Sequence, residues 1–433
     1  MKKKSIITIV IILFLLTTSF FITEHLNKPK EVSIGNAEYL NNAKELDLSN
    51  NSLDNDNNWL TKFREFKNLK KVNLKNQIIT SEQEKYLLLN YPNIKFNMDI
   101  YYKIYEDLYN ENITELDLSN ISVDDKLINY LKPFKNLQKI EFKNNKLKLE
   151  LMSKLVKEYP NIDFNWPINY QNKTISKEDE KISFINNKNL KIAEIKDLIT
   201  ILPNLKEIDF SDSNLTNEEL DSLRKSFPNI NIIWRLHLGK WSLKTNDVAF
   251  SVLVGKIDYV RLTSKDIEVL KYCTNLKALD LGHQAIEDIS IIGTYLKDLR
   301  ILILADNKVK DLTPLKNLKH LHYLELFVNK INDFSPLTEL KELVDINIGY
   351  NDASNIEPLL KLGNIERFWL VNGGITEKDR QTLKNAYPNA IVNTTWSLSS
   401  TEKGWRNHPR YYAMIDMFHK KNYLSEEFSK YDK

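Results

Sequence analysis

The chain has 433 residues, and its 61 basic and 58 acidic side chains leave a net charge of +3, which excludes a generally basic protein that binds nucleic acid. With 42% apolar and 10% aromatic residues, the chain is too hydrophobic to be disordered. The single cysteine, Cys273, excludes an internal disulfide framework and a cysteine-rich zinc site, and without a GxGxxG or GxxxxGK[ST] loop we expect no cofactor.

The first residues, 1–23, are predicted to be an export segment. Lysines at 2–4 precede an apolar run at 5–22, the order found in a secretory signal, and the run is close to the length that spans a bilayer. The lysines place the N-terminus in the cytoplasm and the rest of the chain outside. The apolar run continues past the small residues at 17–19, so an uncleaved membrane anchor and a cleaved signal both stay open. Residues 24–37 are expected to be a linker.

Residues 38–235 are predicted to consist of three repeat blocks. In each block a tyrosine or phenylalanine followed by Pro-Asn closes a helical stretch, because proline cannot continue a helix. These elements lie 68 residues apart, at 91–93, 159–161 and 227–229. The spacing of Thr80 and Gln83 is that of a capping box at the start of a helix, as is that of Thr216 and Glu219. We therefore expect convex helices in these blocks.

An irregular insertion is expected at 236–258, followed by a more regular array at 259–394. The array repeats the frame L-x-x-L-x-L-x-x-N-x-L every 22 residues, starting at Leu299, Leu321 and Leu343. This frame is the leucine-rich-repeat signature. The L-x-L leucines of each short strand point inward, the residues between them face solvent on the concave side, and the asparagine turns the chain.

The same phase can be carried through the whole chain and gives about 16 turns. Strands are predicted near Leu46, Val72, Ile94, Leu116, Ile140, Ile162, Ile182, Ile208, Ile230, Val260, Leu279, Leu302, Leu324, Ile346, Phe368 and Ala390. The predicted fold is an α/β leucine-rich-repeat solenoid, with a curved parallel β-sheet on the concave face and with helices and short turns on the convex face.

The array resembles the 22-residue repeats of bacterial internalin-like surface proteins. The match rests on the L-x-L pairs, on Asn307, Asn329 and Asn351, and on turns of the form D-x-x-P-L. The chain is also similar to secreted or membrane-anchored repeat proteins of low-GC Gram-positive bacteria, through residues 271–283 and the GWRxHPRYY tail at 404–412. Unlike internalins, it has no LPxTG sorting motif and no GW-type module. The resemblance implies a surface protein but no particular ligand.

Residues 395–433 are predicted to form a C-terminal cap. The last turn of a solenoid exposes an apolar edge that needs a cover. Pro409 suits the first position of a helix, and Tyr411, Ile415 and Phe418 would share one apolar face. We expect this helix to pack on the repeat that contains Ala390.

Three features could carry chemistry, and each has a plainer interpretation. His320 and His322 could bind a metal, but they flank a buried leucine and are expected to be exposed without further ligands. Cys273 is more simply a small core residue, and His408 is more simply part of the cap. We therefore predict no catalytic residue and no metal site.

The concave face of the array is the predicted partner-binding surface. A contiguous apolar patch is rare on a monomer without a function, and Trp, Tyr and Arg are enriched at binding hot spots. The alternative is that some of these side chains pack beneath a neighbouring repeat or the tail. The predicted contact residues are Tyr259, Arg261, His283, Ile301, Ile303, Tyr323, Glu325, Phe327, Asp345, Tyr350, Arg367 and Trp369.

The sequence favours a non-enzymatic, extracytoplasmic protein that binds a protein or glycan partner. It is expected to be a monomer, secreted or held at the outer face of the membrane through residues 5–22. Two alternatives remain: a structural envelope protein, or an enzyme with its site at 236–258 or in the tail. The absence of a catalytic constellation disfavours the enzyme, and the aromatic cluster disfavours a purely structural role.

Overall fold

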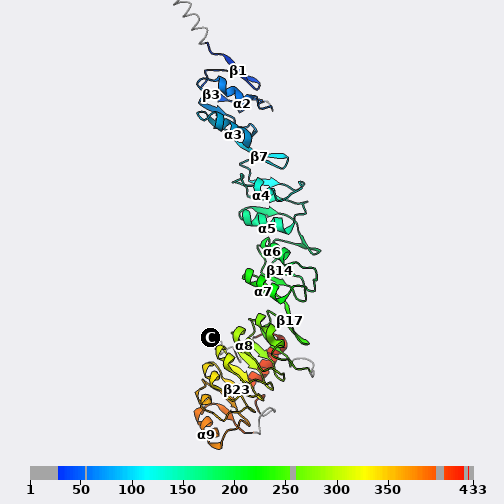
Figure 1. Cartoon of the computed structure of the whole chain (residues 1–433), viewed down its shortest axis with the longest axis vertical. Coiled ribbons are helices and arrows are strands. Elements are labelled where there is room, and N and C mark those ends of the chain that lie inside the picture. Colours follow the sequence, from blue (N-terminus) through cyan, green and yellow to red (C-terminus); the bar gives the residue numbers. More distant parts are fainter. Residues whose placement is uncertain (1–27, 54–55, 254–259, 396–403, 424–427, 429–433) are drawn as a thin grey trace, which may run out of the picture. The chain divides into compact units, whose positions relative to one another are not determined.

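The computed structural model describes residues 28–53, 56–253, 260–395, 404–423 and 428 (Figure 1). The predicted export segment and Tyr259 lie outside these ranges. In the part of the chain that is described, no helix combines the length and the apolarity needed to cross a membrane. The chain divides into two compact units, residues 1–176 and 177–433, which are described in turn.

The first unit is built from short parallel strands. One three-stranded sheet has the order β3-β4-β6, and a second has the order β11-β10-β9. The strands are β3 (Glu45–Asp47), β4 (Lys71–Asn73), β6 (Lys95–Asn97), β9 (Glu115–Asp117), β10 (Lys139–Glu141) and β11 (Asp163–Asn165). In most of these strands the central residue is buried and its neighbours are more exposed, as strand alternation requires. The repeat frame therefore decides which side chains form the core.

Helices complete each repeat of this unit. They are α2 (Trp59–Lys62), the 3₁₀ turn η1 (Phe63–Glu65), α3 (Ser81–Asn90), α4 (Leu127–Tyr130) and α5 (Leu149–Glu158). The predicted capping box is confirmed at the start of α3, where the Thr80 hydroxyl accepts from the Gln83 amide and the Gln83 side chain accepts from the Thr80 amide. The corresponding box of the second unit, Thr216 with Glu219, is confirmed as well.

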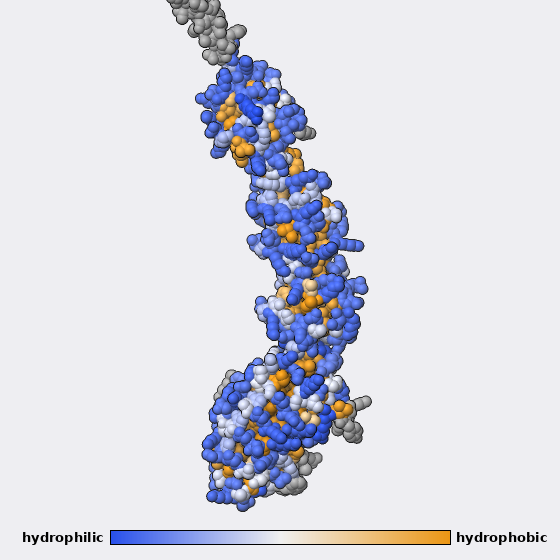
Figure 2. Space-filling model, in the orientation of Figure 1, coloured by the Kyte–Doolittle hydropathy of each residue, from blue (hydrophilic) through white to orange (hydrophobic). Residues whose placement is uncertain are grey.

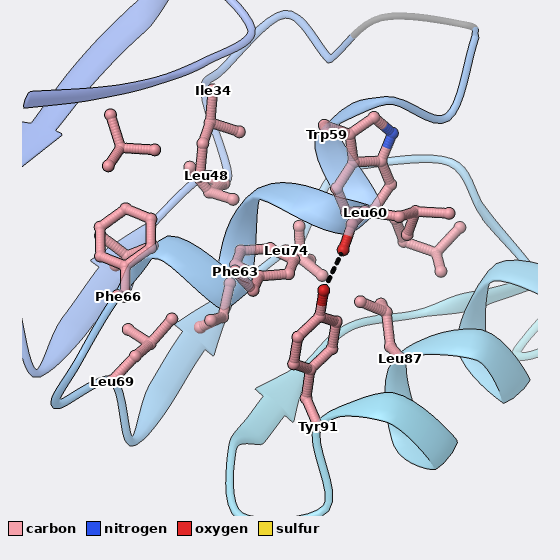
Figure 3. Packing of buried hydrophobic residues seen from close by; sticks show 14 of the residues in the cluster. Ile34, Leu48, Trp59, Leu60, Phe63, Phe66, Leu69, Leu74, Leu87 and Tyr91 are labelled. Atoms are coloured by element: carbon pink, nitrogen blue, oxygen red, sulfur yellow. Dashed lines mark hydrogen bonds between the residues drawn. The ribbon is translucent and has the colours of Figure 1, made fainter. Parts of the chain in front are cut away.

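The aromatic residue before Pro-Asn has a role that the sequence did not reveal. Tyr91 is buried at the end of α3, and its hydroxyl donates to the carbonyl oxygen of Leu60 at 2.8 Å, in the preceding repeat (Figure 3). Its ring meets Phe63 edge-to-face at 5.7 Å. Tyr159 and Tyr387 make the same hydrogen bond, to Ile128 and Leu359. The motif thus ends a helix and also ties two repeats together.

Antiparallel hairpins separate the parallel sheets. Within the first unit these are β1 (Glu31–Ile34) with β2 (Ala37–Leu40), β7 (Ile100–Ile104) with β8 (Asp107–Asn110), and β12 (Ile168–Tyr170) with β13 (Lys173–Ile175). A short strand, β5 (Ile79–Thr80), also pairs with β7. Two of the turns place Tyr105, and Gln171 with Asn172, in the left-handed region that normally selects glycine. The absence of a glycine signal explains why sequence reasoning missed them.

The second unit contains one short and one long parallel sheet. The three-stranded sheet consists of β14 (Lys181–Ser183), β15 (Glu207–Asp209) and β16 (Asn231–Ile233). The seven-stranded sheet consists of β19 (Ala249–Ser251), β20 (Ala278–Asp280), β21 (Ile301–Ile303), β22 (Tyr323–Glu325), β23 (Asp345–Asn347), β24 (Arg367–Trp369) and β25 (Ile391–Asn393). The visible surface is mainly hydrophilic, as expected when the leucines of each frame point inward (Figure 2).

In the second unit, α-helices connect the strands before residue 235, and short 3₁₀ turns make most of the connections in the array at 259–394. The α-helices are α6 (Ile192–Thr200), α7 (Asn217–Ser226), α8 (Ser290–Tyr295), α9 (Glu377–Ala386) and α10 (Pro409–Lys420). The 3₁₀ turns are η2 (Asp266–Tyr272), η3 (Thr313–Asn317), η4 (Ser335–Glu339) and η5 (Pro358–Lys361). A proline near the start of η3, η4 and η5 limits these connections to a single tight turn.

The expected irregular insertion at 236–258 needs correction. It begins with a hairpin of β17 (Arg235–Leu238) and β18 (Trp241–Lys244), which turns at Gly239 with a φ of +57°. It then contributes β19, the first strand of the long sheet. Val260, where a strand was predicted, is 72% exposed and lies outside any strand. The other predicted strand positions lie within a strand or directly before one.

Asparagine side chains link successive repeats of the array. The Asn329 amide donates to the Leu304 carbonyl at 2.8 Å, and its oxygen accepts from the Val309 amide at 2.9 Å. Asn307 and Asn351 make equivalent bonds to the repeats before them. These contacts replace strand bonds that the turn removes, as the sequence suggested.

The residue before each of these asparagines lies in the left-handed region. Asp306 and Tyr350 occupy it, as does Asn372 at the corresponding position of a later repeat, and so does Val328, with a φ of +56°. A β-branched residue is strained in this conformation, whereas asparagine tolerates it.

We expect Val328→Asn to raise the free energy of unfolding by about 1 kcal/mol, because it relieves this strain. Asn372→Val, its reciprocal control, should lower it by a similar amount. Chemical denaturation of both variants tests this, and an unchanged midpoint for Val328→Asn would show that the left-handed valine stores no strain.

Candidate functional site

The helix α10, red in Figure 1, packs on the side of the seven-stranded sheet that faces away from the inward-pointing leucines. Its start is well specified, because Pro409 occupies the first turn and the His408 ring nitrogen accepts from the Arg410 amide at 3.2 Å. The predicted start of a helix at Pro409 is confirmed. We call the covered surface the tail face. It comprises the outward residues of the strands that pack against α10 and Trp405: Ala249, Ala278, Asp280, Ile301, Ile303, Tyr323, Glu325, Asp345, Arg367 and Trp369.

Apolar contacts make up the centre of this interface. Met414, Met417 and Phe418 are buried on one side of α10, while Tyr411 and Ile415 are only partly buried. Trp405 precedes the helix and lies 5.3 Å from the ring of Tyr323 and 5.4 Å from that of Trp369. Phe428 is buried in the same cluster.

A buried ion pair fixes the first turn of α10. The Arg410 guanidinium binds both carboxylate oxygens of Asp345, through Nη2 at 2.6 Å and through Nε at 2.8 Å. Its remaining nitrogen bonds Glu366. Side-on binding of this kind uses the planar geometry of arginine, and lysine cannot reproduce it. Asp345 and Arg410 are both nearly inaccessible to water, so the pair depends on its own hydrogen bonds for compensation.

A second polar chain holds Trp405. Arg367 donates to the Trp405 carbonyl at 2.7 Å and stacks 4.1 Å from the centroid of the Trp405 ring. The Trp405 indole in turn donates to Glu325 at 3.0 Å, and the Tyr323 hydroxyl donates to the same oxygen at 3.1 Å. Burial raises the pKa of Glu325 above its ordinary range, despite these donors.

The structure corrects the expected exposure of seven predicted contact residues. Each is buried on the tail face: Ile301, Ile303, Tyr323, Glu325, Asp345, Arg367 and Trp369. They do lie on the side of the sheet opposite the inward-pointing leucines, as strand alternation predicted. However, α10 packs on this surface, whereas it was expected to pack on the repeat that contains Ala390. Their role as partner contacts stays a prediction, and it requires that α10 leave.

Four other predicted contact residues stay accessible and form what we call the loop row, together with Asp306. Asp306 bonds the His283 ring at 2.9 Å and pairs with Arg261 at 3.4 Å. The rings of Phe327 and Tyr350 meet edge-to-face at 5.1 Å, and both side chains are half-buried.

The loops that carry this row are held by backbone hydrogen bonds. The His283 amide donates to the Ala305 carbonyl, and the Asp306 amide donates to the Phe327 carbonyl, both at 2.7 Å. The Tyr350 amide donates to the Val371 carbonyl at 2.8 Å. The loop row is therefore a fixed edge at the ends of the strands. Tyr259, the remaining predicted contact, lies outside the described residues.

The residues that could carry chemistry have structural roles. His320 and His322 both lie 3.3 Å from the same carboxylate oxygen of Glu342, and His322 is buried, contrary to expectation. Cys273 is buried, and desolvation raises the pKa of its thiol. Among the described residues, no group of three or more His, Cys, Asp or Glu side chains is arranged to hold a metal ion.

Comparison with known proteins identifies the repeat class. The model of the family "Leucine Rich repeats (2 copies)" matches residues 297–339, which include β21 and β22. A search of curated proteins finds no match. The chain thus contains leucine-rich repeats, and the parallel strands with their asparagine turns have the geometry of that fold.

Several solved structures show a distant likeness. An internalin (inlF) of Listeria monocytogenes is 17% identical, with coverage of 78% of each chain and a TM-score of 0.31. Internalin C2 of the same species is 21% identical over 57% of this chain and 92% of its own, with a TM-score of 0.30. A leucine-rich-repeat protein of Leptospira interrogans is 20% identical over 77% of this chain and 92% of its own, with a TM-score of 0.32. At these scores the likenesses carry no argument about function.

The carboxyl group of Asp280, on the tail face, gives a pH test of this site. Burial raises its pKa to about 6 from an ordinary 3.8, although Ser251 and the Gly282 amide donate to it. The folded state therefore binds this proton more tightly than the unfolded state. The stabilisation from protonated Asp280 is present below about pH 4 and is lost as the pH rises through 6.

Asp280→Asn should remove this loss, so the variant gains stability over the wild type by roughly 2–3 kcal/mol between pH 4 and pH 7. Denaturation at a series of pH values measures the difference. Asp311→Asn is the control, because hydrogen bonds from Thr313 lower the pKa of the largely exposed Asp311 and predict the opposite sign. Parallel curves for wild type and Asp280→Asn would contradict the assignment.

Proposed function

We propose that this protein is an exported, non-enzymatic leucine-rich-repeat protein that binds a protein or glycan partner along its loop row. The observation that carries the proposal is the combination, on one edge, of a half-buried aromatic pair, Phe327 with Tyr350, and a polar cluster of Arg261, His283 and Asp306. Aromatic residues and arginine dominate binding hot spots.

The scaffold under the loop row supports this function. Successive loops are connected by backbone hydrogen bonds and by the buried asparagine side chains. A partner would therefore meet side chains that are already in place, which lowers the conformational entropy that binding costs.

Export remains part of the proposal, and it rests on the order of basic and apolar residues at 1–23. If the segment stays uncleaved, residues 5–22 would hold the protein at the outer face of the membrane. The structural-envelope alternative uses the same location but needs no partner at the loop row. An enzyme with its site at 236–258 or in the tail gains no support from the described parts of these segments, which form a hairpin and a strand, or pack on the sheet.

Replacement of both Phe327 and Tyr350 by alanine tests the partner site. The purified wild-type chain would be used to capture a partner from envelope and host fractions, and binding to that partner would then be measured. The double variant should lose about 2 kcal/mol, a roughly thirty-fold fall in affinity. Lys71→Ala is the control, because Lys71 makes only an exposed ion pair with Glu45 in the first unit. Equal affinities for wild type and double variant would exclude the aromatic pair as the site.

The export prediction has its own test. Protease added to intact, wall-stripped cells should digest the repeats, because they would lie outside the membrane. A cytoplasmic protein would serve as the marker for intact cells. Protection of the repeats until lysis would show that the protein is not exported.

A further inference from the structure

We infer that the tail face is a binding surface for an amphipathic helix with an arginine in its first turn, and that α10 is a displaceable occupant of this surface. The partner would be a helical segment of another protein with this chemistry. The inference rests on the proposed function only for the premise that the chain binds proteins, and it adds a second surface and a form of regulation.

The charge of the tail face demands a cationic occupant. Apart from α10, the carboxylates of Glu325, Asp345 and Asp280 share the surface with a single guanidinium, that of Arg367. In solvent these carboxylates would be hydrated. Under an occupant they lose that water, and burial of an unpaired carboxylate is costly. Arg410 meets this requirement in the resident helix, through Asp345 and the half-exposed Glu366.

The geometry makes the requirement specific for arginine. Two guanidinium nitrogens bind the two oxygens of Asp345, and a third binds Glu366. A lysine has one nitrogen at the end of a flexible chain and cannot satisfy both carboxylates in this way. The tail face is therefore selective for arginine over lysine in the first turn of the helix.

The apolar part of the tail face selects large apolar residues at the positions that follow the arginine. Met414, Met417 and Phe418 lie four, seven and eight residues after the arginine, on the buried side of α10. The small side chains of Ala249 and Ala278 leave room beneath the end of the helix, and Ile301 and Tyr323 belong to the same cluster. Methionine adapts to irregular surfaces, so related apolar residues can replace it. The expected partner sequence is thus R-x-x-x-Φ-x-x-Φ-Φ, where Φ is a large apolar residue.

The opposite side of α10 faces solvent, so its sequence is little constrained by contact with the sheet. Tyr412, Asp416, His419 and Lys420 are exposed, and Lys420 pairs with Asp416 within the helix. This one-sided contact is how grooves bind amphipathic helices from other chains. A segment of a different protein can therefore carry the buried pattern on a different solvent-facing surface.

The tail face is occupied in the free protein because α10 belongs to the same chain, so its binding is intramolecular. For such binding the effective concentration is on the order of millimolar. A free helix of equal intrinsic affinity would therefore bind the wild type with an apparent Kd near that concentration. Weakening α10 in its own chain should reveal the intrinsic affinity.

A labelled peptide of residues 404–423 tests the inference with full-length protein and fluorescence polarisation. Arg410→Ala in the protein, with the natural sequence in the peptide, should tighten peptide binding at least roughly tenfold over the wild type. Lys420→Ala is the control, since it removes a positive charge from the exposed side of the same helix and should leave binding weak. A peptide with Arg410→Lys should bind the Arg410→Ala protein at least roughly tenfold more weakly than the natural peptide.

The outcomes are distinct. Amide exchange of 409–420 shows whether α10 has left the sheet. If α10 has left in the Arg410→Ala protein but the peptide does not bind, or if α10 stays protected, the inference is overturned. Wild-type dimers that the peptide disperses would also overturn it, because the occupant would then be α10 of a second copy.

If Arg410→Ala fails to fold, Met417→Ala weakens the same helix without leaving a buried carboxylate unpaired, and the same comparison applies. The experiment needs no natural partner and substitutes neither Phe327 nor Tyr350, whose side chains pack against the cluster that α10 covers. It measures peptide binding and not partner binding, so its failure can be told apart from failure of the loop row.

Discussion

Every repeat of this protein depends on its neighbour, because a strand of three residues cannot satisfy its own backbone groups. The parallel ladder supplies partners along the strand, and an asparagine such as Asn329 supplies them where the chain turns away. Tyr91 and its counterparts add a bond on the helical side. Once these links are made, the outward residues of the strands have fixed positions, and they present both the tail face and the loop row.

The repeat frame made much of this predictable. A 22-residue spacing of leucines and asparagines is sufficient to place strands such as β21 and β22, and a threonine three residues before a glutamine or glutamate is sufficient to place a helix start. The prediction was wrong at Val260, because β19 lies closer to the preceding hairpin than an uninterrupted frame would allow. The hairpin turns at Tyr105 and Gln171 could not be predicted, since their left-handed residues are not glycines.

The candidate site was harder to predict for a different reason. Alternation along a strand places Tyr323 and Trp369 on the outer side, but it says nothing about what covers that side. The tail helix could be predicted from Pro409, but its apolar face was predicted only in part, because Met414 and Met417 are buried instead of Tyr411 and Ile415. Its docking position depends on pairing Arg410 with Asp345, which lies far away in the sequence. No local pattern encodes such a pair. Because this pair holds α10 on the sheet, side chains that were predicted to face solvent are buried.

The hairpins between sheets have a consequence for mechanics. Each of the three short parallel sheets is followed by a hairpin and does not continue into the next sheet, so the ladder of backbone bonds is divided into segments. If the chain were pulled between its two ends, we expect it to yield first where the parallel ladder is interrupted. Extension would then proceed block by block, with separate force steps. The period of 68 residues would set the length released at each step in the N-terminal blocks.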